Sequence, residues 1–231
     1  MKKTSLILLT AIALMNAGKV KATHNAGMDI SYQCLGGNDS FRVQISFYRA
    51  CSGICAPASL EFDYRSASCG FFNGTATLVS FSEIIPYCPT SLPTECSDVC
   101  SSPLDKPDSR EQYIYADTIT LPGFCNDWII SADTATSAPQ YCCRNGSIST
   151  IKVPGSQSIY VEATLNNTIV PCNSSPFFTN PPSPFVYAGQ TFCYNNGAVD
   201  LNGDSLAYYL VTPRTGPNPN DTVDYNELIN P

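Results

Sequence analysis

The clearest pattern along the chain is an alternation of apolar and polar residues with a period of two. In one segment the apolar residues are Phe41, Val43, Ile45 and Phe47, with polar residues between them, and the segment 159–165 alternates in the same way. Successive side chains of a strand point to opposite faces of a sheet. Both segments are therefore predicted to be strands with one face on a core and the other in water.

Weaker strand signals are separated by clusters of Gly, Pro, Asn and Ser, which favour turns. They occupy residues 28–34, 58–65, 75–83, 112–121, 126–132, 147–153, 185–194 and 205–211. We find no segment with the apolar spacing of an amphipathic helix. Roughly ten short strands with turn signals between them predict an all-β protein, an antiparallel immunoglobulin-like β-sandwich.

The N-terminus has the pattern of a secretory signal peptide. Lys2 and Lys3 precede an apolar run that is too short to span a bilayer, and small residues at Val20 and Ala22 suit cleavage just before Thr23. Residues 1–22 are therefore predicted to be removed on export, which places the mature chain outside the cell or on its outer surface. No later segment reaches the roughly 20 apolar residues of a transmembrane helix, so the mature chain is not expected to span the membrane.

All 12 cysteines follow this predicted signal peptide, and exported cysteines are usually oxidised. The disulfide candidates are Cys34, Cys51, Cys55, Cys69, Cys88, Cys96, Cys100, Cys125, Cys142, Cys143, Cys172 and Cys193. Six disulfides are expected, with the pairing left open. The adjacent Cys142 and Cys143 are expected to reach different partners, of which Cys125 is one candidate, because a ring between neighbours is strained. Zinc bound by the two Cys-x-x-x-Cys spacings is the alternative.

Proline-rich stretches suggest how the chain is divided. Residues 23–170 are predicted to form the β-sandwich, with a long Cys- and Pro-containing loop at 86–110. Residues 171–184 are predicted to be a Pro-rich linker. Residues 185–231 supply two credible strands and a polar tail, and two strands alone are marginal. We therefore expect them to be the start of a second β domain that continues beyond this sequence.

The charge excludes some classes of partner. The full chain carries −7; without the four lysines of the predicted signal peptide, 8 basic residues face 19 acidic ones, a net charge near −11. Such a surface repels nucleic acid and anionic membranes. Charged residues are 13% of the chain and aromatic residues 11%, which is the composition of a folded protein rather than of a disordered acidic tail.

Several segments resemble one known family. They include residues 22–38 and 171–182, and the motifs FYRAC at 47–51, CNDW at 125–128, CCRNGS at 142–147 and DLNGDSL at 200–206. Together they resemble the N-terminal region of large surface proteins of Bacteroidetes. Members of that family often contain PKD or other immunoglobulin-like repeats and end in a gliding-motility-associated, type IX secretion sorting domain. The family usually has a bulky apolar residue and paired glycines where Asn25, Ala26 and Gly27 stand.

The resemblance implies an extracellular protein of the cell envelope with adhesive or matrix roles, linked to attachment or gliding. It also implies that residues 185–231 begin a PKD- or cadherin-like domain. It implies no particular ligand, because the family is named for its sorting domain and repeats. The expected partner is therefore an unidentified surface ligand, either a glycan or another cell-envelope protein.

One motif has the chemistry of a metal site. In Asp200, Asn202 and Asp204, oxygen-bearing side chains alternate around a glycine turn, and calcium prefers such oxygen ligands. The alternative is an acidic turn that leads into the predicted strand at 205–211. Calcium is the cofactor that this motif suggests.

Catalytic machinery is not evident. A Ser–His or Cys–His nucleophile needs an imidazole, and the only histidine, His24, stands at the predicted mature N-terminus. A carboxylate pair for glycoside cleavage has Glu61, Asp63 and Glu83 as candidates, but nothing in the sequence sets their separation. We therefore expect a non-enzymatic, adhesin-like or structural surface module. The alternatives are a secreted hydrolase without a recognised motif and a carbohydrate-binding protein, which 13 tyrosines and 11 phenylalanines would suit.

Overall fold

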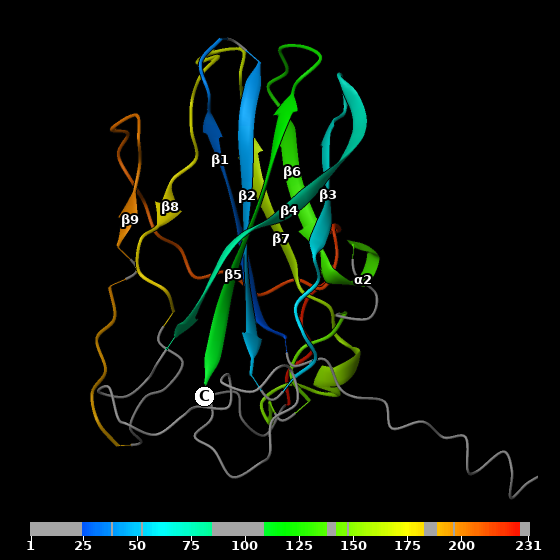
Figure 1. Ribbon diagram of the computed structural model, residues 1–231, viewed down its shortest axis with the longest axis vertical. Coiled ribbons are helices and arrows are strands. Elements are labelled where there is room, and N and C mark those ends of the chain that lie inside the picture. The colour runs from blue at the N-terminus through cyan, green and yellow to red at the C-terminus, as the bar shows by residue number, and fades with distance from the viewer. Residues whose placement is uncertain are drawn as a thin grey trace, which may run out of the picture.

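A computed structural model describes residues 25–37, 39–51, 53–84, 109–137, 142–146, 148–182, 189–195 and 197–226. Among these residues, seven strands form one antiparallel sheet (Figure 1). They are β1 (Asn25–Cys34), β2 (Ser40–Ala50), β3 (Ser59–Ser66), β4 (Gly70–Ile84), β5 (Arg110–Thr120), β6 (Trp128–Asp133) and β7 (Tyr160–Leu165). The prediction of an antiparallel all-β sandwich is confirmed.

The sheet folds into two layers because β4 belongs to both of them. The first half of β4 pairs with β3 and the second half with β5, and the register shifts between Leu78 and Ser80. The strand order is β1-β2-β5-β4-β3-β6-β7. One layer thus contains β1, β2, β5 and the end of β4, and the other contains the start of β4 with β3, β6 and β7. This is the strand order of immunoglobulin sandwiches.

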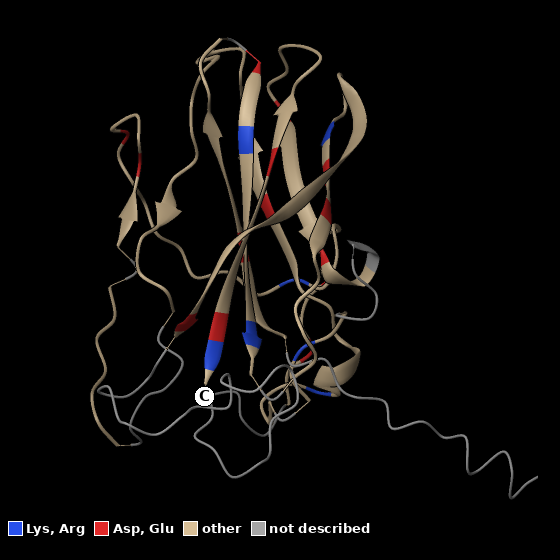
Figure 2. Cartoon of the chain, viewed as in Figure 1, with Lys and Arg blue, Asp and Glu red and all other residues tan. Residues whose placement is uncertain are grey.

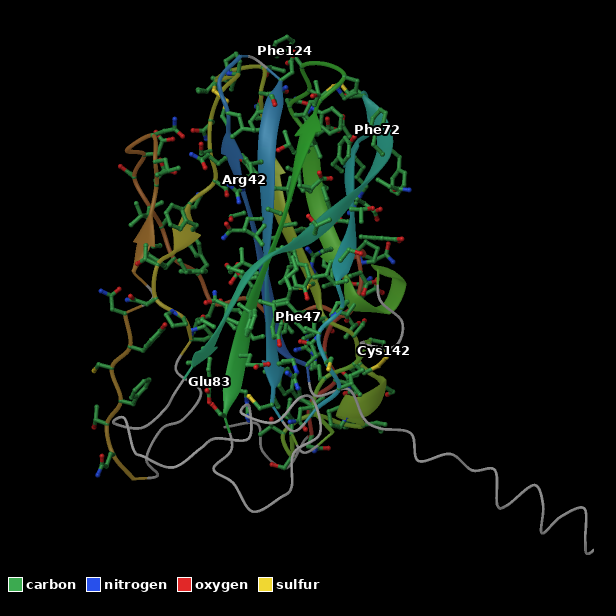
Figure 3. All side chains as sticks on the ribbon, in the orientation of Figure 1. Arg42, Phe47, Phe72, Glu83, Phe124 and Cys142 are labelled. Atoms are coloured by element: carbon green, nitrogen blue, oxygen red, sulfur yellow. A yellow bond between two sulfur atoms is a disulfide. The ribbon has the colours of Figure 1, made fainter. Side chains whose placement is uncertain are left out.

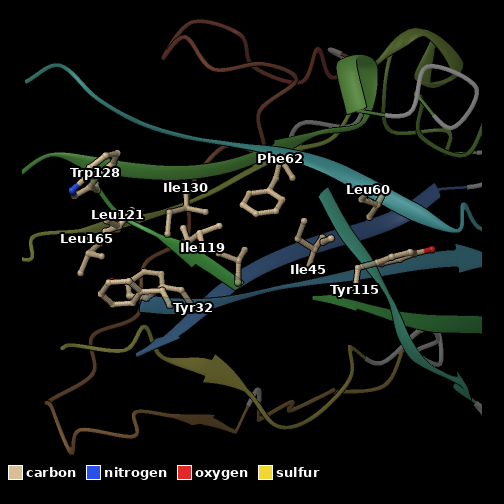
Figure 4. Close-up of a cluster of buried hydrophobic side chains, with 14 of the residues drawn as sticks. Tyr32, Ile45, Leu60, Phe62, Tyr115, Ile119, Leu121, Trp128, Ile130 and Leu165 are labelled. Carbon is tan, nitrogen blue, oxygen red and sulfur yellow. The ribbon is translucent and has the colours of Figure 1, made fainter. Parts of the chain in front are cut away.

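The core lies between the layers and follows the alternation of the sequence. Phe41, Val43 and Ile45 are 0% exposed, as is Trp128 on β6. Figure 4 shows how side chains from both layers meet in this cluster, with Phe62 and Ile130 reaching toward Ile45. Burial of each large apolar side chain stabilises the fold by about 1.5–3 kcal/mol. The core therefore holds the two layers together.

Two predicted strands are not strands in the structure. Residues 148–153 make one isolated bridge, between Ile151 and Tyr225, and are followed by the 3-10 helix η3 (Pro154–Ser156). Residues 205–211 are irregular, and Leu210 is fully exposed. An alternating pattern specifies a strand only when a second strand pairs with it. The predicted strand at 185–194 lies partly outside the described residues. The short helix α2 (Thr134–Ser137) follows β6.

Two disulfides connect distant segments at the same end of the sandwich. Cys34 at the end of β1 pairs with Cys172 after β7, and Cys69 in the β3–β4 turn pairs with Cys125 before β6. Because neighbouring strands are antiparallel, all four positions lie at the end that Phe124 marks in Figure 3. Cys51 and Cys55 are disulfide-bonded too, which contradicts the zinc alternative, since zinc would need their thiolates.

The expectations for the remaining cysteines need correction. Cys142 and Cys143 bond to each other, so the prediction of separate partners for them is wrong. Cys125 is engaged by Cys69, because the turn after β3 lies beside the connection that leads into β6. Cys193 is an exposed free thiol, so the expectation that all 12 cysteines pair is not met. Cys88, Cys96 and Cys100 lie outside the described residues.

The segments after β7 are attached to the sandwich. Ser175 Oγ accepts a hydrogen bond from Tyr32 N of β1 at 2.8 Å, and Tyr160 N of β7 donates to Arg214 O at 3.2 Å. Between these contacts, β8 (Phe177–Phe178) and β9 (Ala198–Val199) form a two-stranded sheet beside β1 (Figure 1). The linker at 171–184 and the second domain at 185–231 stay predictions.

Other expectations fall on parts of the chain that the structure leaves undescribed. The signal peptide at 1–22, His24 and most of the predicted loop at 86–110 lie there. Within the described ranges, no helix has the length and apolar character needed to cross a membrane.

Candidate ligand-binding site

A cleft opens between the edge of the first layer and the segment that carries β8. Its volume is about 470 Å³, which lies within the range of small-molecule sites. One wall comes from the start of β1, the end of β2 and the start of β5, and the other from residues after β7. The lining residues are Ala26, Gly27, Met28, Asp29, Tyr48, Arg110, Phe178, Asn180, Pro182 and Tyr194.

The sheet side of the cleft holds a chain of hydrogen bonds. Tyr48 OH donates to Asp29 Oδ2 at 2.9 Å, and Gln112 Nε2 donates to Tyr48 OH at 3.1 Å. Met28 and Ile30 pack against the core, so alternation turns Asp29 to the outer face of β1. Burial raises the pKa of Asp29, and the hydrogen bonds from Tyr48 and Ser46 partly oppose this rise. Burial beside that carboxyl also raises the pKa of Tyr48.

The opposite side of the cleft is aromatic and open to solvent. Phe178 is 53% exposed, and Tyr194 is 40% exposed. The ring of Tyr194 stacks on that of Phe192, with an interplanar angle of 12°. Tyr194 OH donates to Asn180 O at 3.2 Å, and Asn180 Nδ2 donates to Asn195 O at 2.8 Å. These contacts hold the aromatic rings on a defined wall, although no layer of the sandwich covers them.

A second groove continues from this cleft along β1 and β7. Its volume is about 870 Å³, and it shares Met28, Asp29 and Phe178 with the first cleft. Its far wall is formed by residues 211–214, where Arg214 makes an ion pair with Glu162. The Arg214 guanidinium also lies 4.6 Å from the centre of the Tyr160 ring. The cleft and the groove therefore adjoin at Met28, Asp29 and Phe178.

The predicted calcium residues form a turn. Asp200 Oδ1 accepts hydrogen bonds from the backbone N–H groups of Asn202 at 2.8 Å and Asp204 at 3.2 Å. Asn202 Oδ1 accepts from Ser174 N at 2.8 Å. Such bonds are typical of Asx turns, and they engage one oxygen of Asp200 and the side-chain oxygen of Asn202. Over the described residues, no three His, Cys, Asp or Glu side chains are grouped to hold a metal. The geometry supports the structural turn, and calcium binding stays a prediction.

The carboxylates considered for glycoside cleavage do not converge on the cleft. Glu61 and Asp63 lie on β3, and neither lines the cleft or the groove. Glu83 of β4 accepts a hydrogen bond from Ser109 Oγ at 2.7 Å. It lies ten residues along β4 from Asn73, the residue that pairs with Asp63 of β3. That separation corresponds to about 33 Å of strand. The structure therefore does not bring Glu83 to Asp63 as a catalytic pair.

Sequence reasoning did not identify the cleft residues. Asp29 stands at a polar position of the alternation in β1, between Met28 and Ile30, and its acidic side chain on a strand is the one signal in the sequence. Phe178 and Asn180 stand inside the predicted linker, and a Pro-rich linker pattern does not indicate a binding surface. Their neighbours across the cleft are far away in sequence, so only the folded chain reveals the site. Figure 2 shows that positions of both charge signs occur on several strands of the sandwich.

Comparisons with known protein families, with curated proteins and with solved structures found no match for this chain. The resemblance to Bacteroidetes surface proteins therefore stays a prediction, and the cleft is interpreted from its own chemistry.

Proposed function

We propose that the chain is an exported, non-enzymatic module of the cell surface that binds a surface ligand. The observation that carries this proposal is the pair of disulfides Cys34–Cys172 and Cys69–Cys125, which fasten one end of the sandwich. Such bonds persist in oxidising compartments and are rare in a reducing cytosol. The N-terminal pattern of lysines followed by an apolar run supports the same location.

A recognition module needs loops held in place on a rigid scaffold. The disulfides close chain segments of 138 and 56 residues, which restricts the unfolded chain far more than the folded one. The sandwich then presents the cleft on its edge, with hydrogen-bonding groups on one wall and exposed rings on the other. This arrangement is typical of binding sites, where apolar contact provides affinity and a few polar groups provide specificity.

The hydrolase alternative needs two carboxyl groups on either side of a scissile bond. Asp29 is one carboxyl group with a raised pKa at the centre of the surface. The second carboxylate along the groove, Glu162, is held in an ion pair with Arg214. Asp29 and Glu162 both lie on the sandwich side of the groove, on β1 and β7, so they do not flank a bound chain from opposite sides, which supports binding over hydrolysis.

Export and oxidation are tested together by expressing the full chain in a bacterium and isolating it from the medium or the cell surface. N-terminal sequencing is expected to give a start near Thr23. Intact mass is expected to rise on reduction by at least eight hydrogens, because eight of the described cysteines are bonded. The rise is expected to be smaller than 12 hydrogens, because Cys193 is free.

The matched control is Leu8→Arg, which breaks the apolar run of the predicted signal peptide and is expected to retain the chain in the cytosol. Proteolysis of intact cells is expected to degrade the unaltered protein and to spare this variant. A protein that keeps residues 1–22, stays inside the cell and has only free thiols would overturn the proposal.

A further inference from the structure

Exposed aromatic rings gather where the cleft and the groove meet. Phe178 belongs to both, and Tyr194 stands beside it on the same wall of the cleft. Their exposed fractions are 53% and 40%, so flat apolar faces remain in contact with water. Such faces gain free energy when another flat apolar surface covers them. The C–H faces of pyranose sugar rings are surfaces of this kind.

The polar groups of the cleft complement sugar hydroxyls. Asp29 is a hydrogen-bond acceptor that Tyr48 orients, and Asn180 lines the opposite wall with an amide that both donates and accepts. A hydroxyl group donates to a carboxylate and accepts from an amide at the same time. Arg110 also lines the cleft, so an anionic ligand would meet one guanidinium there, but Asp29 and the net negative charge of the chain would oppose its binding.

The size of the surface indicates an oligosaccharide. The cleft of about 470 Å³ continues into the groove of about 870 Å³, and both are bordered by Asp29 and Phe178. A chain of sugar rings that begins on Tyr194 would pass Phe178 and follow β7 toward Arg214. We infer that the cleft and the groove bind a neutral oligosaccharide of pyranose rings. This inference rests on the proposed function and names the class of ligand.

The experiment measures binding of the exported, oxidised full chain to defined hexasaccharides by isothermal titration calorimetry. The neutral probes are cellohexaose, laminarihexaose and mannohexaose, and the anionic probe is hexagalacturonate. At least one neutral probe is expected to bind with a Kd below about 1 mM, and hexagalacturonate is expected not to bind. Phe178→Ala and Tyr194→Ala are each expected to weaken that binding at least tenfold.

Three further variants separate stacking, hydrogen bonding and folding. Phe178→Leu keeps apolar bulk without a flat ring and is expected to bind as weakly as Phe178→Ala. Asp29→Asn is expected to weaken binding through loss of the charged acceptor. Phe71→Ala is the matched control, because Phe71 is 60% exposed on β4 and lines neither the cleft nor the groove. It is expected to bind as the unaltered protein does.

Each opposite result would overturn the inference. These results are no binding of any neutral probe, stronger binding of hexagalacturonate, or an equal loss of binding in Phe71→Ala. Fluorescence of Trp128, the only tryptophan, reports whether each variant is folded. If the chain is exported and oxidised but binds no probe, only the ligand class fails. If it is neither exported nor oxidised, the proposed function fails as well.

Discussion

At the scale of single residues, the core leaves no room for one added methyl group. Gly74 of β4 stands directly opposite Phe62 of β3, and a Cβ atom at position 74 would lie 2.2 Å from the Phe62 ring. Phe62 is only 2% exposed, so its ring has little space into which to move. The glycine is therefore required by its neighbour across the strands, although it weakens strand propensity.

Gly74→Ala is expected to lower the free energy of unfolding by about 1–3 kcal/mol, which is typical of overpacking. Urea unfolding followed by Trp128 fluorescence measures the change. The control is Gly155→Ala, where an added Cβ meets nothing within 4 Å. Equal unfolding midpoints for the two variants would contradict the tight contact.

A buried ion pair is the second residue-scale feature. Arg49 and Glu111 face each other across β2 and β5, with side chains only 5% and 9% exposed. Arg49 Nη2 also donates to Cys51 O and Gly53 O, each at 2.9 Å, and Tyr113 OH donates to Glu111 at 2.8 Å. These bonds hold the chain that follows β2 against the start of β5.

Glu111→Ala is expected to lower the free energy of unfolding by about 3–5 kcal/mol, because it leaves a buried guanidinium without its counter-charge. The control is Asp224→Ala, which removes the exposed ion pair between Asp224 and Lys152. The side chain of Lys152 is 41% exposed and that of Asp224 is 64% exposed. That variant is expected to change the free energy of unfolding by less than about 1 kcal/mol. Similar losses of unfolding free energy in the two variants would mean that the fold depends no more on the buried Arg49–Glu111 pair than on an exposed one.

At the scale of elements, disulfides differ in how much chain they close. Cys34–Cys172 spans 138 residues and ties the segment after β7 to β1, whereas Cys142–Cys143 spans a single step. Loop closure restricts the unfolded chain more as the loop becomes longer. The Cys34–Cys172 bond is therefore expected to stabilise the fold more than the Cys142–Cys143 bond.

The double variant Cys34→Ser with Cys172→Ser is expected to lower the free energy of unfolding by about 2–5 kcal/mol. The double variant Cys142→Ser with Cys143→Ser is expected to lower it by less than about 1 kcal/mol, because almost no loop is closed. Urea unfolding of both proteins measures this. A larger loss in the second variant would show that the adjacent pair stabilises the native state through its contacts.

The turn at 200–204 is the second element with a measurable role. Asn202 Oδ1 accepts from Ser174 N, and Ser174 is 4% exposed, so loss of this acceptor leaves a buried donor unsatisfied. Asn202→Ala is expected to lower the melting temperature through a loss of about 1–3 kcal/mol, equally with and without millimolar calcium. Asp204→Asn serves as the control. A rise in melting temperature on addition of calcium that Asp204→Asn abolishes would establish the calcium site instead.

The strands show which elements a local pattern can predict. The alternating segments 41–47 and 159–165 form most of β2 and β7, because other strands of a half-buried sheet pair with each of them. The weaker strand signal at 205–211 has no strand beside it among the described residues, and Tyr209 is 84% exposed. Strand pairing depends on residues far apart in the chain, and a local period of two does not show which strands pair.

At the scale of the whole molecule, the segment after β9 is connected to the sandwich by several contacts. Arg214 pairs with Glu162 of β7, Lys152 N donates to Asp224 O at 2.8 Å, and Asn226 N donates to Thr150 O at 3.0 Å. Val223 is 4% exposed within this segment. Such contacts are expected to couple the stability of residues 213–226 to that of the sandwich.

The chain is therefore expected to unfold in one transition. Trp128 fluorescence reports the core, and hydrogen exchange at the Val223 amide, which donates to Pro213 O at 2.9 Å, reports the C-terminal segment. The two probes are expected to give the same free energy of unfolding. Arg214→Ala is expected to lower the protection of Val223 first. Two separate transitions would support the predicted division into two domains.

The sequence by itself determined the class of the fold and the positions of most strands, because alternation, turn residues and cysteine content are local properties. It also gave reason to expect export, a disulfide framework and an acidic surface. The tertiary structure alone decided that Cys69 meets Cys125, that Asn202 binds Ser174, and that Asp29 faces Phe178 across a cleft. Each of these pairs joins residues that are well separated in the chain and that only the fold brings together. Long-range geometry of this kind leaves no periodic signal in the sequence.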